Sequence, residues 1–93
     1  MKLVKLNNRH KLYRYGYTHA LRFNGYGAES KRIFAIESYL QSAYPGIGLW
    51  HASLEHPRTA WAIHWPPKAN GVRPYWIGFK KEEDAIMCIL IGQ

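Results

Sequence analysis

The chain has 93 residues, of which 47% are hydrophobic, 15% aromatic and 20% charged. This length excludes a multidomain enzyme, because so short a chain cannot divide its apolar residues between two cores. The composition is typical of a folded domain and not of a disordered segment. We therefore expect a single domain over residues 1–93, with a core rich in aromatic rings.

The chain contains thirteen Lys and Arg residues but only six Asp and Glu residues, which gives a formal net charge of +7. This imbalance favours a polyanion or an acidic protein surface as the partner. Residues 1–11 are expected to form a basic N-terminal arm. Six cations precede the first acid, Glu29: Lys2, Lys5, Arg9, Lys11, Arg14 and Arg22.

The single cysteine, Cys88, has the apolar neighbours Met87, Ile89 and Leu90. A single cysteine cannot form an internal disulfide, and the apolar neighbours of Cys88 indicate a buried thiol in a reducing compartment. No apolar run approaches the roughly 20 residues that span a bilayer. We therefore expect a cytoplasmic protein that does not interact with a membrane.

The residues from Lys11 to Phe23 alternate as in a β-strand. One face would carry a ladder of tyrosines, and Leu21 and Phe23 would point toward the core. Further along, residues 28–43 show the three- and four-residue spacing of a helix. Its apolar stripe consists of Ile33, Ile36, Leu40 and Ala43.

Two strands are predicted next, at Leu49–Leu54 and Thr59–Trp65, joined by a turn that contains Pro57. In the second of them, Trp61, Ile63 and Trp65 should share one face. A third strand is expected at Tyr75–Phe79, after a loop in which Asn70-Gly71 favours positive φ.

A helix over Lys80–Leu90 should end the domain, because the acids at 82–84 complement the positive end of a helix dipole. Its Ala85, Ile86, Ile89 and Leu90 are expected to pack on the sheet. The fold class is therefore α+β, in the order β-α-β-β-β-α. Two helices would cover one face of an antiparallel sheet and leave the other face open for function.

The open face and two loops supply the candidate binding residues. Rings at alternate strand positions can stack on bases while cations neutralise phosphates. The alternative is that the tyrosines pack on the helices and that the turn residues are simply solvated. Trp76, opposite Tyr75 and Phe79, is expected to be exposed. The candidates are Lys2, Lys5, Arg9, Lys11, Tyr13, Arg14, Tyr15, Tyr17, His56, Arg58, Arg73 and Trp76.

Catalysis has less support in the sequence. The nearest approach to a metal or acid-base site is a set of three histidines and one carboxylate, but their spacing on strands separates the side chains too widely. We therefore expect no enzyme activity, metal or cofactor, and keep a small hydrolase only as a testable alternative. The residues concerned are His51, Glu55, His56 and His64.

Two segments resemble RNA-binding families. Tyr75–Ala85, an aromatic strand followed by acids and an alanine, is similar to the end of an RNA-recognition motif, although Pro74 and Tyr75 replace that family's glycine-aromatic-glycine rhythm. The helix-strand-strand-strand-helix order over residues 28–90 resembles a double-stranded-RNA-binding domain, but acids stand at 82–84 where that family presents lysines. Both resemblances concern topology.

The C-terminal pattern, a strand ending in Phe79-Lys80 followed by Asp84-Ala85 and an apolar helix, also resembles many short bacteriophage-encoded proteins. That resemblance implies a small protein that binds a host or viral macromolecule.

We therefore expect a non-enzymatic protein whose basic aromatic surface docks on nucleic acid or a nucleoprotein complex and modulates it. The alternative is an inhibitor or adaptor that binds an acidic surface of a host protein. An open sheet edge in so short a domain also makes a homodimer conceivable.

Overall fold

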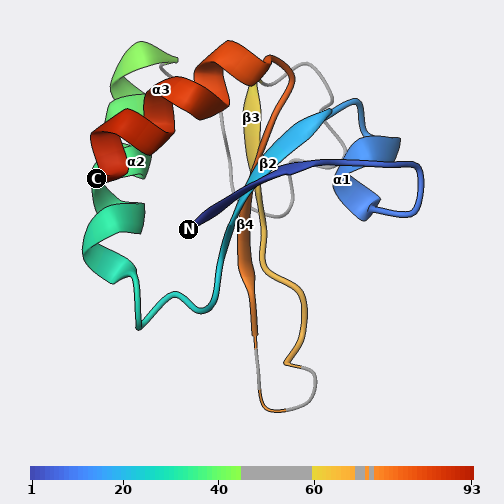
Figure 1. The fold of residues 1–93 in the computed structure, drawn as a ribbon, viewed down its shortest axis with the longest axis horizontal. Helices are drawn as coiled ribbons and strands as arrows, with labels where there is room; N and C mark the ends of the chain where they lie inside the picture. Colours follow the sequence, from blue (N-terminus) through green and yellow to red (C-terminus); the bar gives the residue numbers. More distant parts are fainter. Residues whose placement is uncertain (45–59, 69–70, 72) are drawn as a thin grey trace.

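The computed structural model describes residues 1–44, 60–68, 71 and 73–93 (Figure 1). The α+β prediction is confirmed: these residues form one antiparallel sheet, in the strand order β1-β2-β4-β3, together with helices. Along the chain the elements are β1 (Lys2–Lys5), α1 (Lys11–Arg14), β2 (His19–Phe23), α2 (Ser30–Ala43), β3 (Trp61–His64), β4 (Tyr75–Phe79) and α3 (Glu82–Gly92).

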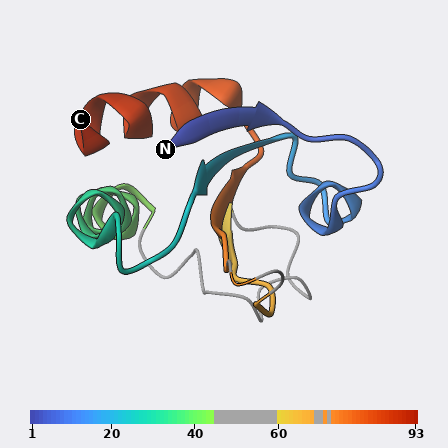
Figure 2. The same ribbon diagram turned by 60° about the horizontal axis from the view of Figure 1, so that its bottom comes forward.

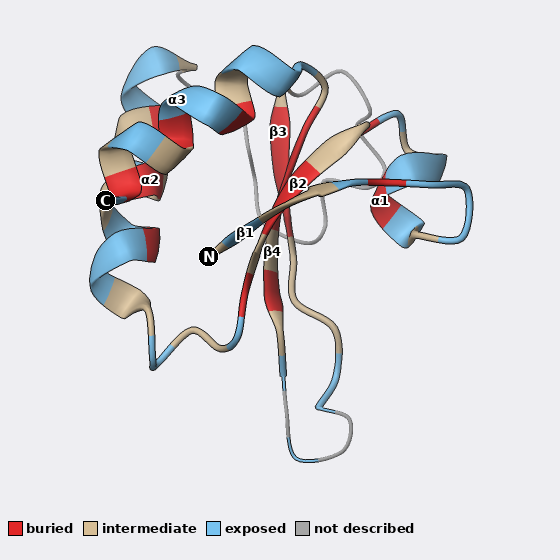
Figure 3. Ribbon diagram, in the orientation of Figure 1, coloured by how far each residue is buried: buried red, intermediate tan, exposed pale blue. Residues whose placement is uncertain are grey.

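Helices α2 and α3 lie together on one side of the sheet, and the short α1 lies on the other (Figures 1 and 2). The larger core fills the space between the sheet and the α2–α3 pair, and a smaller one lies beneath α1. Figure 3 shows the buried residues of α2 and α3 on the sides that meet the sheet and each other. The predicted arrangement of two helices on one face is therefore present, with a third helix on the opposite face.

The register of the strands determines which residues face each layer. Leu21 of β2 pairs with Ile77 of β4, which in turn pairs with Ile63 of β3, and all three lie in the larger core. Because side chains alternate along a strand, their neighbours in sequence face α1 or solvent. The predicted inward positions of Leu21 and Phe23, and the shared face of Trp61, Ile63 and Trp65, are confirmed.

The prediction of a continuous strand from Lys11 to Phe23 is wrong in its first half. His10 is the N-cap of α1, and its Nδ1 accepts a hydrogen bond from the Leu12 amide at 3.0 Å. Gly16, at φ 98°, then turns the chain into β2, a conformation that strongly favours glycine. A single helical turn therefore replaces the expected tyrosine ladder.

Other boundaries differ for reasons of packing. Residues Lys2–Lys5, expected to be an arm, form β1 by pairing with β2. In α2 the predicted core residues are buried except Ala43, which is exposed. Ala85 and Cys88 of α3 are buried, but Ile86 and Leu90 are exposed. Nearly every side of this helix is apolar, so its sequence alone does not specify which side faces the core. The strand expected at Leu49–Leu54 lies outside the described residues.

Candidate nucleic-acid interface

A row of polar and aromatic residues crosses the sheet on the side opposite α2 and α3. Lys2 of β1 pairs with Arg22 of β2, Arg22 with Trp76 of β4, and Trp76 with His64 of β3. Paired residues point to the same side of a sheet, so these four side chains come from four neighbouring strands onto one surface. We call this row, together with the adjoining α1 and its N-cap, the basic face: Lys2, His10, Lys11, Tyr13, Arg14, Arg22, His64 and Trp76.

The indole of Trp76 is the centre of the basic face. The His10 ring meets it edge to face, with 4.6 Å between ring centroids, and the His64 ring lies 5.5 Å from that of His10. The guanidinium carbon of Arg22 lies 5.7 Å from the Trp76 ring centroid, within the range of a cation–π contact. Trp76 is half-buried, as are Arg22 and His64. The surface therefore presents an aromatic cluster beside fixed positive charge.

Both histidines of the cluster favour the neutral form. Burial lowers the pKa of His10 below 6.5. Burial, followed by the nearby His10 and Lys11, lowers the pKa of His64 to about 4. At neutral pH the charge of the basic face therefore comes from its lysines and arginines, while the imidazoles act as flat polar rings.

Small residues of the sheet allow α1 to approach it closely. Ala20, Gly78 and Ala62 are paired in register across β2, β4 and β3. A Cβ atom on Gly78 would lie 3.0 Å from Cδ1 of Leu12, and the Leu12 side chain is fully buried. Leu12 thus fastens α1 to the sheet and fixes the position of the cations and of the exposed Tyr13 on that helix.

The described acids are confined to one side of the sheet, whereas described cations lie on both sides. All of the described acids belong to the layer of α2 and α3: Glu29 is the N-cap of α2, and the others lie within the two helices. The ion pairs found here join these acids to the N-terminus, Arg32 and His19. Within the described part of the chain, the lysines and arginines of the basic face pair with no carboxylate. The remaining acids are Glu37, Glu82, Glu83 and Asp84.

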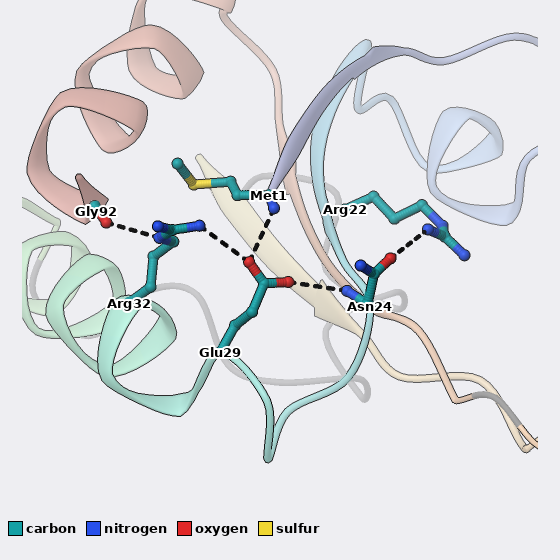
Figure 4. Close-up of polar contacts among 6 residues, drawn as sticks. All are labelled: Met1, Arg22, Asn24, Glu29, Arg32 and Gly92. Atoms are coloured by element: carbon teal, nitrogen blue, oxygen red, sulfur yellow. Dashed lines mark hydrogen bonds and ion pairs between the residues drawn. The ribbon is translucent and has the colours of Figure 1, made fainter.

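Glu29 illustrates how the opposite layer uses its carboxylates (Figure 4). Its Oε1 accepts from the N-terminal ammonium at 2.8 Å and from Nη1 of Arg32 at 3.1 Å, and its Oε2 accepts from the Asn24 amide at 3.0 Å. Nε of Arg32 also donates to the carbonyl of Gly92 at 2.9 Å. This network joins the N-terminus before β1, the β2–α2 loop, α2 and the end of α3, so its charged groups stabilise the fold.

The Glu29 network also reaches the basic face. Nη1 of Arg22 donates to Oδ1 of Asn24 at 3.2 Å, and the backbone of Asn24 is held by Glu29. The guanidinium of Arg22 is therefore restrained from two sides, by Asn24 and by the Trp76 ring.

The structure brings together five of the residues that the sequence proposed for binding: Lys2, Lys11, Tyr13, Arg14 and Trp76. Three further members of the basic face were not proposed, namely His10, Arg22 and His64. Arg22 could have been found, because the alternation that points Leu21 and Phe23 inward also points Arg22 outward. His10 and His64 come together only through the position of α1 on the sheet.

Other proposed residues lie elsewhere. Lys5 pairs with His19 and so belongs to the opposite side of β1 from Lys2. Tyr17 is fully buried in the smaller core, so a stacking role for it is wrong, and Tyr15 is half-buried beside that core. Arg9 is exposed just before α1.

The loop candidates divide in the same way. The guanidinium carbon of Arg73 lies 3.9 Å from the ring centroid of Trp65, and its Nε donates to the Pro66 carbonyl at 3.0 Å, which makes it part of the local loop structure. His56 and Arg58 lie outside the described residues, as do His51 and Glu55 of the alternative hydrolase site.

The described residues contain no cluster of three or more His, Cys, Asp or Glu suited to a metal ion. Burial, followed by the nearby Asp84, raises the pKa of the Cys88 thiol to about 12, so this group is protonated and a poor nucleophile. In the same part of the chain, no helix combines the length and apolar character needed to cross a bilayer.

Among known proteins, no protein-family model, curated protein or solved structure matches the chain.

Proposed function

We propose that this is a non-enzymatic, cytoplasmic protein that binds nucleic acid, alone or within a nucleoprotein complex, through its basic face. The observation that carries the proposal is the confinement of the described acids to the side of the sheet opposite the basic face. Lys2, Lys11, Arg14 and Arg22 gather on the side where the described residues include no acid. Phosphates are attracted to such a surface, and the counterions they release on binding favour association.

The aromatic residues of the same surface supply the second part of the proposal. Exposed or half-buried rings next to cations are the usual means of holding unpaired bases, since every base has a π-face. Tyr13 is 42% exposed, and Trp76 is half-buried with Arg22 beside its ring. We therefore expect single strands to bind more tightly than duplexes, because a duplex keeps its bases stacked internally.

A protein partner with an acidic surface is the second candidate. Tyr, Trp and Arg are the residues that most often dominate protein interfaces, and Tyr13, Trp76 and Arg14 or Arg22 provide all three types on one surface. An inhibitor or adaptor of this kind would use the same basic face, so a nucleic-acid titration separates the two functions.

The deciding experiment is fluorescence anisotropy with labelled single-stranded and double-stranded DNA and RNA, at two salt concentrations. We expect micromolar or tighter binding to single strands that weakens steeply with salt. Absence of binding at low salt would refute the nucleic-acid function and favour the acidic protein partner. A pull-down with nuclease treatment then tests that second function directly.

Two lysines of one strand give a matched pair of variants. Lys2 and Lys5 are both exposed at the edge of the sheet, but they point to opposite sides of β1. Lys2→Gln should weaken binding and lower the salt slope by about 0.7 for a single strand, the value for one phosphate contact. Lys5→Gln removes the same charge from the other side and should change the slope little. Equal effects of the two variants would mean that net charge alone, and not the basic face, drives binding.

A further inference from the structure

Two histidines from distant parts of the chain meet at the centre of the basic face. His10 caps α1, His64 ends β3, and their ring centroids lie 5.5 Å apart in an edge-to-face arrangement. The His10 ring also meets that of Trp76, with 4.6 Å between centroids. Lysines and arginines keep their charge near neutral pH, whereas histidines do not. The pair is therefore the part of the basic face whose charge depends on pH.

The N-cap of α1 fixes the proton of the His10 ring. The Leu12 amide can only donate, so the Nδ1 atom that accepts from it at 3.0 Å carries no proton, and the proton of the neutral ring is on Nε2. A second proton would enter at Nδ1 and would break this hydrogen bond. Burial also lowers the pKa of His10, so two effects keep its ring neutral.

His64 is the member of the pair that can take up a proton. Its ring is half-buried and makes no hydrogen bond to another described residue, so a ring nitrogen is free for the proton. The described groups that act on its charge are His10 and Lys11, while its strand partner Trp76 is uncharged and has Arg22 beside its ring. Burial, His10 and Lys11 lower the pKa of His64 to about 4, so the free protein holds this ring neutral.

A bound phosphate would reverse the electrostatics around His64. A nucleic acid held by the cations of the basic face brings negative charge to the surface where His64 lies, and beside a protein this attraction is stronger than in bulk water. The negative charge offsets that of Lys11 and favours the charged imidazole, so the pKa of His64 is higher in the complex. By linkage, the proton and the phosphate then strengthen each other's binding.

We propose that nucleic-acid binding at the basic face is coupled to the uptake of one proton by His64, so that acidification strengthens binding. This inference rests on the proposed function and adds its regulation by pH. The gain in affinity is complete below the pKa of about 4 of free His64, and it is lost as the pH rises through the higher pKa of the complex. Between those two values the affinity changes by up to about tenfold per pH unit.

Fluorescence anisotropy with labelled oligothymidylate tests the coupling at constant ionic strength. Thymine bases and phosphodiesters keep their charge between about pH 5.5 and 7.5, so a change in affinity comes from the protein. We expect binding to be about tenfold or more tighter at pH 5.5 than at pH 7.5. Binding that does not tighten on acidification would overturn the coupling and leave the proposed function standing. Absence of binding at every pH would overturn both.

Two histidine variants locate the proton. His64→Gln keeps a polar side chain that cannot be charged, so the slope of log Kd against pH should flatten. His19→Gln is the matched control, because His19 lies on the opposite side of the sheet, with its Nε2 3.5 Å from Glu82. This variant should keep the slope of the unmodified protein, with circular dichroism showing that both variants are folded. Equal slopes in the two variants would overturn the assignment to His64.

Nuclear magnetic resonance of the unmodified protein tests His64 directly and does not depend on the folding of a variant. The ring signals of His64 should titrate near pH 4 in the free protein and at a higher pH in the complex with oligothymidylate. The same midpoint in both states would refute the coupling.

Discussion

Replacement of Leu12 by alanine should destabilise the domain strongly, although α1 is only four residues long. Leu12 is fully buried against Tyr17 and Gly78, with Ala20 and Ala62 in the same cluster. The change removes three carbon atoms from the smaller core. At about 0.8 kcal/mol per carbon this gives about 2.4 kcal/mol, and the cavity left behind raises the expected cost to about 3–4 kcal/mol.

The assay is urea unfolding followed by tryptophan fluorescence and far-UV circular dichroism. A domain of this size has a free energy of unfolding of about 5–14 kcal/mol, so the loss is a large fraction of the total. Tyr13→Ala is the control on the same helix, because its partly exposed ring should cost about 0.5 kcal/mol or less. A cost below about 1 kcal/mol for Leu12→Ala would show that α1 does not pack on the sheet.

Two predictions concern carboxylates of the helix layer. Burial raises the pKa of Glu29, but its bonds from the N-terminus and Asn24 and the charge of Arg32 outweigh this and lower it below 4.5. Glu29 therefore stabilises the fold above pH 4.5. Glu29→Gln should lower the free energy of unfolding by about 1–3 kcal/mol at pH 7. Urea titrations at several pH values should show this loss becoming smaller as the pH falls below 4.5. A deficit that is constant with pH would contradict this role. The Tyr75 hydroxyl donates a hydrogen bond to the Glu37 carboxylate. Burial raises the pKa of Glu37, although this hydrogen bond acts to lower it. Tyr75→Phe should lower stability by about 1–2 kcal/mol at pH 7 and by less at pH 4, where Glu37 is protonated. An equal loss at both pH values would refute that assignment.

The local sequence predicted the elements whose periodicity or turns are unambiguous. Tyr75–Phe79 is a strand with the bounds expected, and α2 begins two residues from its predicted start. The alternation of Trp61, Ile63 and Trp65 also placed these side chains on the correct face, with Trp61 and Ile63 in the larger core and Trp65 packed against it. In each case the apolar residues lie on one side of the element, so a single orientation buries them.

The basic face shows what local pattern leaves undecided. Alternating Lys, Tyr and Arg residues fit a strand as well as a helical turn, and α1 forms because His10 caps it and Leu12 finds the small residues of the sheet. Those small residues come from strands far apart in the chain. A local pattern therefore could not show that Leu12 would be buried or that Tyr13 would be exposed.

By itself, the sequence determined the excess of positive charge, the α+β class and the inward faces of the main strands, because composition and periodicity act locally. Only the tertiary structure decided where that charge is concentrated. The antiparallel pairing of four strands brings Lys2, Arg22, Trp76 and His64 into one row, and the packing of α2 and α3 confines the described acids to the other side. Strand register and the choice of buried helix face depend on contacts between distant segments, which no local pattern specifies.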